Sequence, residues 1–198
     1  MKLAEQEQLK YSIKRTKKLL RKSKLNKFEA FKNAGMRLTG SGSFAECFCY
    51  GNYAIKIFSP EQDEAYYSYL MKIKGLDNPY VPKIYSIDSV KIGKLEYLIV
   101  VMELLCEEYN LSRAEIMKCY QEHTWDKDYL PLIFHSYNFN KKLKYTNEKL
   151  NELLKIIGDL IKDGFANDIS GRNILYRLEN DGTYTPVFTD PIWTGDPI

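Results

Sequence analysis

The segment from Met36 to Phe58 constrains the fold most, because glycine interrupts its strand-like alternation twice. The first interruption is Gly40-Ser41-Gly42-Ser43, and the second is Gly51-Asn52, a pair suited to a tight reversal. The pieces between these interruptions have the length and alternation of short strands. We therefore expect neighbouring antiparallel strands in this part of the chain.

The remaining pattern is mixed. A helix is predicted from about Glu61 to Ile73 after Pro60, followed by a loop from Gly75 to Pro82 and strands near Lys83–Ile87 and Glu96–Met102. The second half is mostly helical, with helices at Leu111–Cys119 and Asn147–Ile161 and an irregular stretch between them. It ends in a hairpin of Asn173–Arg177 and Thr185–Thr189, turned at Asn180-Asp181-Gly182. These elements predict an α+β fold.

Composition excludes disorder and a membrane span. The chain has 198 residues, 44% of them hydrophobic and 28% charged, as in ordinary globular proteins. Its longest apolar run, Tyr97 to Leu105, is broken by Glu103 and is far shorter than the roughly 20 residues that span a bilayer. The lysine-rich N-terminus lacks the apolar stretch of a signal peptide. We expect a cytosolic protein with no membrane contact, whose 4 cysteines are reduced.

Charge is concentrated at the N-terminus. Residues 1–35 hold 11 Lys/Arg and 3 Asp/Glu, a balance of +8, so the remainder carries −5 of the overall +3. Leu9, Ile13, Thr16 and Leu20 recur there at helical spacing, which predicts an amphipathic helix with a cationic face. This helix either packs on the body as a solvated element or contacts an acidic or phosphate-rich partner. Without interleaved aromatics for base stacking, nucleic acid is a minor candidate partner.

The Gly-x-Gly loop and the strand after it contain the first candidate site. Glycines let backbone N–H groups approach a phosphate closely, and Phe44 at the loop tip could cover it, although Gly-Ser hairpins are also common. On the returning strand, Ala54 and Lys56 share one face, near Cys47 of the preceding strand. A lysine there needs an anionic partner such as a phosphate or a helix carboxylate, unless it reaches solvent from an edge strand.

The second candidate site lies near the C-terminus. Asp168 and Asn173 are five positions apart in D-I-S-G-R-N-I-L-Y, and Asp190 ends the apolar strand V-F-T-D-P. Each of the three is a common turn residue. Together they supply the hard oxygen atoms that hold Mg²⁺ beside phosphate oxygens. Strand period also places Leu175 on the same face as Asn173.

In this order the residues resemble the motifs of the protein-kinase-like superfamily. The matching motifs are Gly40-x-Gly42, Ala54-x-Lys56, Glu64 on a helix, the apolar run into Glu103–Leu105, Asp168-x4-Asn173 and Asp190. The resemblance covers residues 36–192. The sequence motifs N-D-I-S-G-R-N-I-L-Y and F-T-D-P-I-W are most similar to those of the small early serine/threonine protein kinases of lytic bacteriophages. The Asp-x-Ser opening is also similar to the atypical RIO kinases.

The resemblance implies a bilobal kinase-like fold. A basic helix (1–35) would precede an antiparallel N-lobe with one helix (36–105) and a reduced, mainly helical C-lobe (106–198). The chain would transfer the γ-phosphoryl group of ATP, with Mg²⁺, to protein Ser/Thr hydroxyls. Its substrates would be host proteins in the host cytoplasm, if a phage encodes it. Autophosphorylation is also expected, because the basic helix offers Ser12, Thr16 and Ser23 as accessible hydroxyls.

The resemblance also implies residue roles. Asp168 would orient or deprotonate the acceptor hydroxyl, and Asn173 and Asp190 would hold Mg²⁺. Lys56 would pair with the α/β-phosphates, braced by Glu64. The phosphates would be covered by Gly40, Ser41, Gly42, Ser43 and Phe44. Adenine would meet backbone groups of Glu103 to Leu105 and apolar walls formed by Cys47, Ala54 and Leu175.

The sequence also departs from the family pattern. The third loop glycine is Ala45, and Ala166-Asn167 replaces the His-Arg pair before the catalytic aspartate. Ser170 stands where a lysine is usual, with Arg172 as a substitute cation for the γ-phosphate. Only 8 residues follow Asp190, so we expect no activation segment. These departures leave two alternatives open, a small-molecule phosphotransferase and an inactive kinase-like binding module. The sequence does not indicate an oligomeric state.

Overall fold

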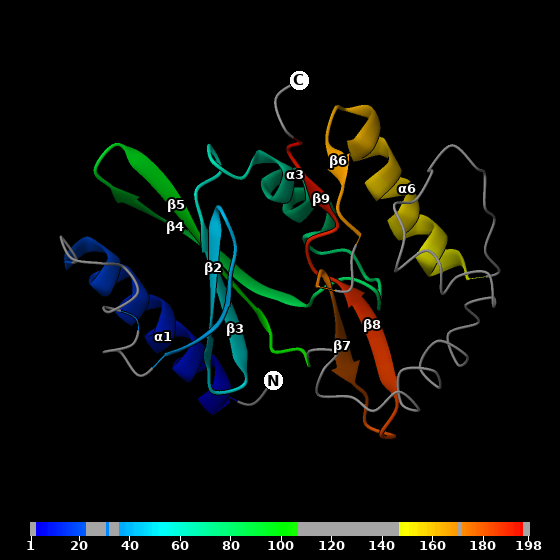
Figure 1. The fold of residues 1–198 in the computed structure, drawn as a ribbon. Helices are drawn as coiled ribbons and strands as arrows, with labels where there is room; N and C mark the ends of the chain where they lie inside the picture. The colour runs from blue at the N-terminus through cyan, green and yellow to red at the C-terminus, as the bar shows by residue number, and fades with distance from the viewer. Residues whose placement is uncertain (1–2, 23–30, 32–35, 107–146, 170–171, 196–198) are drawn as a thin grey trace. The chain divides into compact units, whose positions relative to one another are not determined.

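The computed structural model describes residues 3–22, 31, 36–106, 147–169 and 172–195 and divides the chain into two compact units (Figure 1). The first unit contains residues 1–63 and 83–104, and the second contains residues 64–82 and 105–198. The class is α+β with an antiparallel sheet, as predicted. The predicted helix at 111–119 and the irregular stretch at 122–142 lie outside the described residues.

The first unit is built on a five-stranded antiparallel sheet of order β1-β2-β3-β5-β4. Its strands are β1 (Arg37–Ser41), β2 (Ala45–Tyr50), β3 (Tyr53–Phe58), β4 (Ile84–Ile92) and β5 (Leu95–Glu103). Both predicted glycine interruptions separate strands, and Gly51 has a φ of 58°, which favours glycine at the β2–β3 reversal. Strands β4 and β5 are longer than predicted, because they pair through to a turn at Gly93-Lys94.

One face of this sheet carries the core of the first unit. Phe48, Ile55 and Val101 stand opposite one another in β2, β3 and β5, and each is at most 1% exposed. Phe31 stacks on Phe48 with ring centroids 4.4 Å apart. Burying such side chains contributes about 1.5–3 kcal/mol each, so this face stabilises the unit.

The basic helix α1 (Leu3–Lys22) belongs to the first unit and contacts β4. It confirms the predicted amphipathic helix for the residues it contains, since Ile13 packs against the core cluster while Lys14 and Lys18 are exposed. The expectation that Thr16 is accessible is wrong. Its side chain is 0% exposed, with the hydroxyl 3.8 Å from the sulfur of Met36, because it lies on the buried face of the helix.

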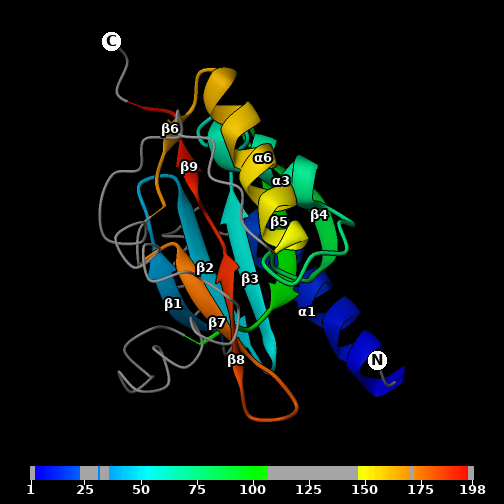
Figure 2. The same cartoon turned by 90° about the vertical axis from the view of Figure 1, so that its right-hand side faces the viewer.

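In its described residues, the second unit combines two helices with two small strand pairs, and Figure 2 shows these helices side by side. The helices are α3 (Glu64–Ile73) and α6 (Glu148–Lys162), and the strands are β6 (Ala166–Asn167), β7 (Ile174–Leu178), β8 (Tyr184–Phe188) and β9 (Ile192–Trp193). The β7–β8 hairpin and α6 agree with the predictions. The Asn147 side chain caps α6 by accepting from the Leu150 N–H at 3.1 Å.

Helix α3 differs from the prediction in two respects. It begins at Glu64 rather than Glu61, because the N–H groups of Gln62 and Asp63 both bond the Ser59 carbonyl in a preceding turn. It also belongs to the second unit, whereas the sequence analysis placed it in the 36–105 lobe. The physical reason is its apolar face, which contacts α6 and β9. The buried residues on α3 are Ala65, Tyr66, Tyr69, Leu70 and Ile73.

Among the described residues, no helix has both the length and the apolar character needed to cross a membrane. The described cysteines Cys47, Cys49 and Cys106 form no disulfide with one another, and Cys119 lies outside the described residues.

Candidate functional site

Two strand pairs of the second unit bring Asp168, Asn173 and Asp190 together. Asn173 directly precedes β7, and Asp190 follows β8 by two residues, so the hairpin register of Ile174 with Phe188 sets them at the same end. Asp168 directly follows β6, whose pairing with β9 brings its N–H to 2.8 Å from the Pro191 carbonyl. Residues up to 22 positions apart in the sequence therefore converge.

Side-chain hydrogen bonds hold this cluster in place. The amide nitrogen of Asn173 donates to the Asp168 carboxylate at 2.8 Å and to its backbone carbonyl at 2.8 Å. The Asn167 side chain accepts from the Ile169 N–H at 3.0 Å, which shapes the loop after Asp168. The hydrogen bonds of these turn residues therefore also fix where the Asp168 carboxylate and the Asn173 amide lie.

The electrostatics of the cluster distinguish Asp168 from an ordinary surface carboxylate. The Asp168 side chain is exposed, but the loss of part of its hydration raises its pKa, and the negative charge of Asp190 raises it further. The hydrogen bond from Asn173 and the positive charge of Arg172 oppose this rise. A carboxylate with a raised pKa is a better proton acceptor, so Asp168 is suited to act as a general base.

The cluster also has the donor atoms for a hard cation. Among the described residues, no group of three or more His, Cys, Asp or Glu side chains is arranged to hold a metal ion. The candidate set instead contains carboxylates and one amide. Because the amide nitrogen of Asn173 faces Asp168, its amide oxygen is the atom that a cation would meet, together with Asp190. Oxygen ligands in small number suit Mg²⁺, which keeps several waters.

Thr189 is a further member of this site that the sequence analysis did not identify. Its N–H and its hydroxyl both donate to the Asn173 carbonyl, at 2.8 Å and 3.0 Å. Because Thr189 directly precedes Asp190, these two bonds hold the backbone of Asn173 beside that of Asp190. No local sequence pattern predicts these bonds, because the Asn173 carbonyl lies 16 positions before Thr189 in the chain.

Tyr69 is a second residue that the sequence analysis missed. It lies on α3, is 0% exposed, and donates its hydroxyl to the Phe188 carbonyl at 2.8 Å. Burial, with a smaller contribution from Asp190, raises its pKa well above the ordinary value. Tyr69 thus holds the end of β8 that leads to Asp190. No local pattern marked this tyrosine among the 16 in the chain.

Leu175 is half-buried on β7, one residue beyond Ile174. Leu105, in the second unit, is half-buried too, and the residue after it, Cys106, exchanges backbone hydrogen bonds of 2.8 Å with Tyr176. Glu64 is exposed in the first turn of α3. Lys56 belongs to the first unit and Glu64 to the second.

The glycine-rich loop of the first unit connects β1 to β2. The Gly42 N–H donates to the Ala45 carbonyl at 2.9 Å, which leaves Ser43 and Phe44 exposed at the tip. Neither Gly40 nor Gly42 has a positive φ, and an added Cβ would meet its nearest atom at 3.8 Å and 3.9 Å, ordinary contact distances. The fold of the loop therefore does not itself require glycine at these positions.

Lys56 lies on the sheet face opposite the core. The register places it directly across from Cys47 on one side and Val100 on the other, while Cys49 stands across from Ala54. Lys56 is half-buried and sits on a central strand, so it is not an edge-strand lysine. Ser41, which follows Gly40 in β1, ends this strand and is exposed.

Glu103 ends β5 and has a structural role. Its carboxylate accepts from the Lys83 N–H at 2.7 Å, and its own N–H donates to the Lys83 carbonyl at 3.0 Å. Glu103 is 8% exposed. Its N–H is therefore already used within the sheet, and the expected adenine contacts of Glu103–Leu105 would depend on other backbone groups.

Compared with models of known protein families, the chain matches none, and no curated protein has a significantly similar sequence.

Proposed function

We propose that the protein is an ATP- and Mg²⁺-dependent phosphotransferase that phosphorylates Ser/Thr hydroxyls of proteins. The convergence of Asp168, Asn173 and Asp190 in the second unit carries this proposal, because a proton acceptor and two oxygen ligands are the groups this reaction needs. The finer fold class, a bilobal kinase-like chain with a reduced C-lobe, belongs to the same proposal.

Asp168 acts on the acceptor hydroxyl. Its pKa is raised by the loss of part of its hydration and by Asp190, which favours acceptance of the hydroxyl proton. The hydrogen bond from Asn173 keeps the carboxylate oriented, and positioning of this kind supplies much of the rate enhancement in phosphoryl transfer. Asn173 and Asp190 would hold Mg²⁺, which would neutralise charge on the phosphate oxygens.

Residues of the first unit bind the nucleotide in this proposal. The exposed tip of the glycine-rich loop offers backbone N–H groups to the phosphates, and the absence of a conformational need for Gly40 and Gly42 supports a role in close approach of a ligand. Lys56 supplies a cation from a central strand, where a half-buried ammonium group benefits from an anionic partner.

A transfer assay with γ-labelled ATP tests the proposal. Wild type, Asp168→Asn and Asp163→Asn are incubated with Mg²⁺ and with the protein alone, a casein-like protein or a bacterial lysate. Asp163 is the matched control, because it is an exposed aspartate at the C-terminal end of α6. We expect protein-bound label from wild type and Asp163→Asn, its loss with chelator, and a reduction of about 10² or more in Asp168→Asn.

The acceptor is identified from the product. Acid-stable phosphoserine or phosphothreonine in the labelled protein agrees with the proposal. Label found only in a small charged product contradicts the protein acceptor and favours a small-molecule phosphotransferase. No transfer to any acceptor, with thermal stabilisation by ATP retained, contradicts catalysis and favours a binding module.

A further inference from the structure

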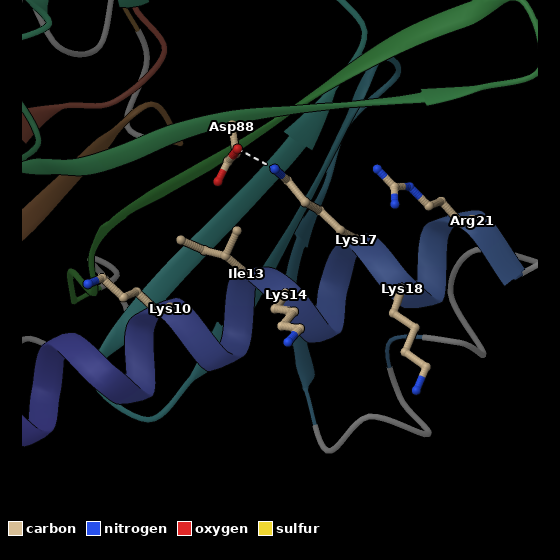
Figure 3. Close-up of a pocket in the computed structure, with 7 residues that line it drawn as sticks. All are labelled: Lys10, Ile13, Lys14, Lys17, Lys18, Arg21 and Asp88. Atoms are coloured by element: carbon tan, nitrogen blue, oxygen red, sulfur yellow. Dashed lines mark hydrogen bonds and ion pairs between the residues drawn. The ribbon is translucent and has the colours of Figure 1, made fainter.

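A basic groove lies on the first unit between α1 and β4, and its lining contains none of the candidate site residues described above (Figure 3). It encloses about 590 Å³. Its lining consists of the lysines at positions 10, 14, 17 and 18, with Arg21, Ile13 and Asp88. Among the described lining residues, Asp88 comes from β4 and the others from α1, so this helix supplies the cationic side of the groove in the described part of the chain.

The positive charges follow one stripe of α1. Positions 10, 14, 18 and 21 follow one another at intervals of three or four residues, and position 17 lies four before 21, so at 3.6 residues per turn all five fall within an arc of about 100° on one side of the helix. They extend over about three turns, or roughly 16 Å at 1.5 Å per residue. Lys17 pairs with Asp88, whereas Lys10, Lys14, Lys18 and Arg21 are exposed and form no ion pair within the described part of the chain. The stripe therefore presents a surplus of positive charge.

The floor of the groove is apolar. Ile13 packs against the core cluster of the first unit but remains half-exposed toward the groove. The methylene stems of the lysines on either side add apolar surface, since lysine keeps only its ammonium group in water. The groove thus combines a cationic rim with an apolar strip along its base.

A cationic rim beside an apolar strip favours an acidic polypeptide over a nucleic acid. A phosphodiester chain has no apolar group to place on Ile13 and would meet the carboxylate of Asp88, and none of the described residues that line the groove is an aromatic that could stack a base. A polypeptide can alternate carboxylates with apolar side chains and can donate backbone hydrogen bonds to Asp88. An extended segment of about five residues spans roughly 16 Å.

We propose that this groove binds an acidic segment of a partner protein. Carboxylates of the segment meet the basic side chains of α1 that have no ion-pair partner among the described residues, and an apolar side chain between these carboxylates covers Ile13. The Lys17–Asp88 pair sets one wall of the groove and keeps Lys17 from the ligand. This interaction does not depend on phosphotransferase activity and is measured by binding alone.

Fluorescence anisotropy on the full chain tests the proposal. The probe is a fluorescein-labelled glutamate-rich peptide with one central leucine. Lys14→Glu/Lys18→Glu reverses two exposed charges of the stripe, and Lys74→Glu/Lys94→Glu makes the same change of net charge in two exposed turns outside the groove. We expect the groove variant to raise the Kd about tenfold or more, and the control to change it less than about twofold.

Two further probes test the two parts of the groove. Replacing the leucine of the peptide by glycine should raise the Kd about threefold or more, because the apolar floor loses its partner. A duplex DNA probe should bind less tightly than the peptide at about 0.15 M salt. Equal effects of the groove and control variants would overturn the proposed site. Tighter binding of the duplex, or no difference between leucine and glycine peptides, would overturn the assignment of the ligand.

Discussion

Replacing Tyr69 by phenylalanine should destabilise the second unit by removing a single buried hydrogen bond. The Tyr69 hydroxyl donates to the Phe188 carbonyl at 2.8 Å, and the side chain is 0% exposed. A buried neutral hydrogen bond contributes about 0.5–1.5 kcal/mol, and incomplete satisfaction of the carbonyl adds to the loss, so we expect about 1–2 kcal/mol. The substitution leaves the ring in place, so no large cavity forms.

The pH dependence of this difference provides a sharper test. Burial first, and Asp190 second, raise the pKa of Tyr69 well above 10.0, so the native tyrosine stays neutral while the unfolded one ionises. The contribution of Tyr69 to stability is therefore present below about pH 10 and declines as the pH rises above that value. The loss reaches about 1.4 kcal/mol roughly one pH unit above 10. The phenylalanine variant has no such loss, so the difference between the two proteins should shrink toward zero there.

Urea denaturation of wild type, Tyr69→Phe and Tyr67→Phe at about pH 8 and about pH 11 measures both effects. Tyr67 lies on the same helix and is 36% exposed, so its replacement should change the free energy of unfolding by less than about 0.5 kcal/mol. Equal destabilisation by the two variants would refute the contribution of the hydrogen bond. A difference for Tyr69→Phe that stays constant up to high pH would refute the assignment of the raised pKa.

Two other predictions concern the second unit. Asp168→Asn should raise the Tm at neutral pH in chelator, because burial and Asp190 raise the pKa of Asp168 and its ionised form therefore opposes folding. The gain in Tm should vanish below about pH 3.8, where the Asp168 carboxyl is protonated in both the folded and the unfolded state. A lower Tm of the variant at neutral pH would contradict this reasoning. Asn78→Ala should lower the free energy of unfolding by about 2–3 kcal/mol, because Asn78 is 6% exposed and its side chain bonds the Lys149 carbonyl, the Glu152 carboxylate and the Tyr80 N–H. The control is Asn180→Ala, in the exposed hairpin turn, measured in the same urea denaturation. An equal effect of the two substitutions would show that the bonds of Asn78 contribute nothing.

The elements that sequence patterns predicted well are those whose causes are local. The reversal at Gly51-Asn52, the hairpin turned at Gly182 and the Asn147 cap of α6 each depend on side chains within a few positions of one another. The bond between Asn173 and Asp168 likewise joins side chains only five positions apart. Such features could be read from residue types and spacing alone.

Other features arise only when distant segments pack. The two-residue strands β6 and β9 are too short to carry a pattern, yet their pairing brings Asp168 beside Pro191 and sets the charge of Asp190 near it. Helix α3 joins the second unit because its apolar face packs there, and Thr16 is buried although its neighbours on α1 are basic. Propensity and period describe neighbours along the chain, whereas burial and the pKa of a carboxylate depend on neighbours in space. The sequence by itself determined the candidate acid, amide and lysine, while tertiary structure decided which of these side chains share one environment.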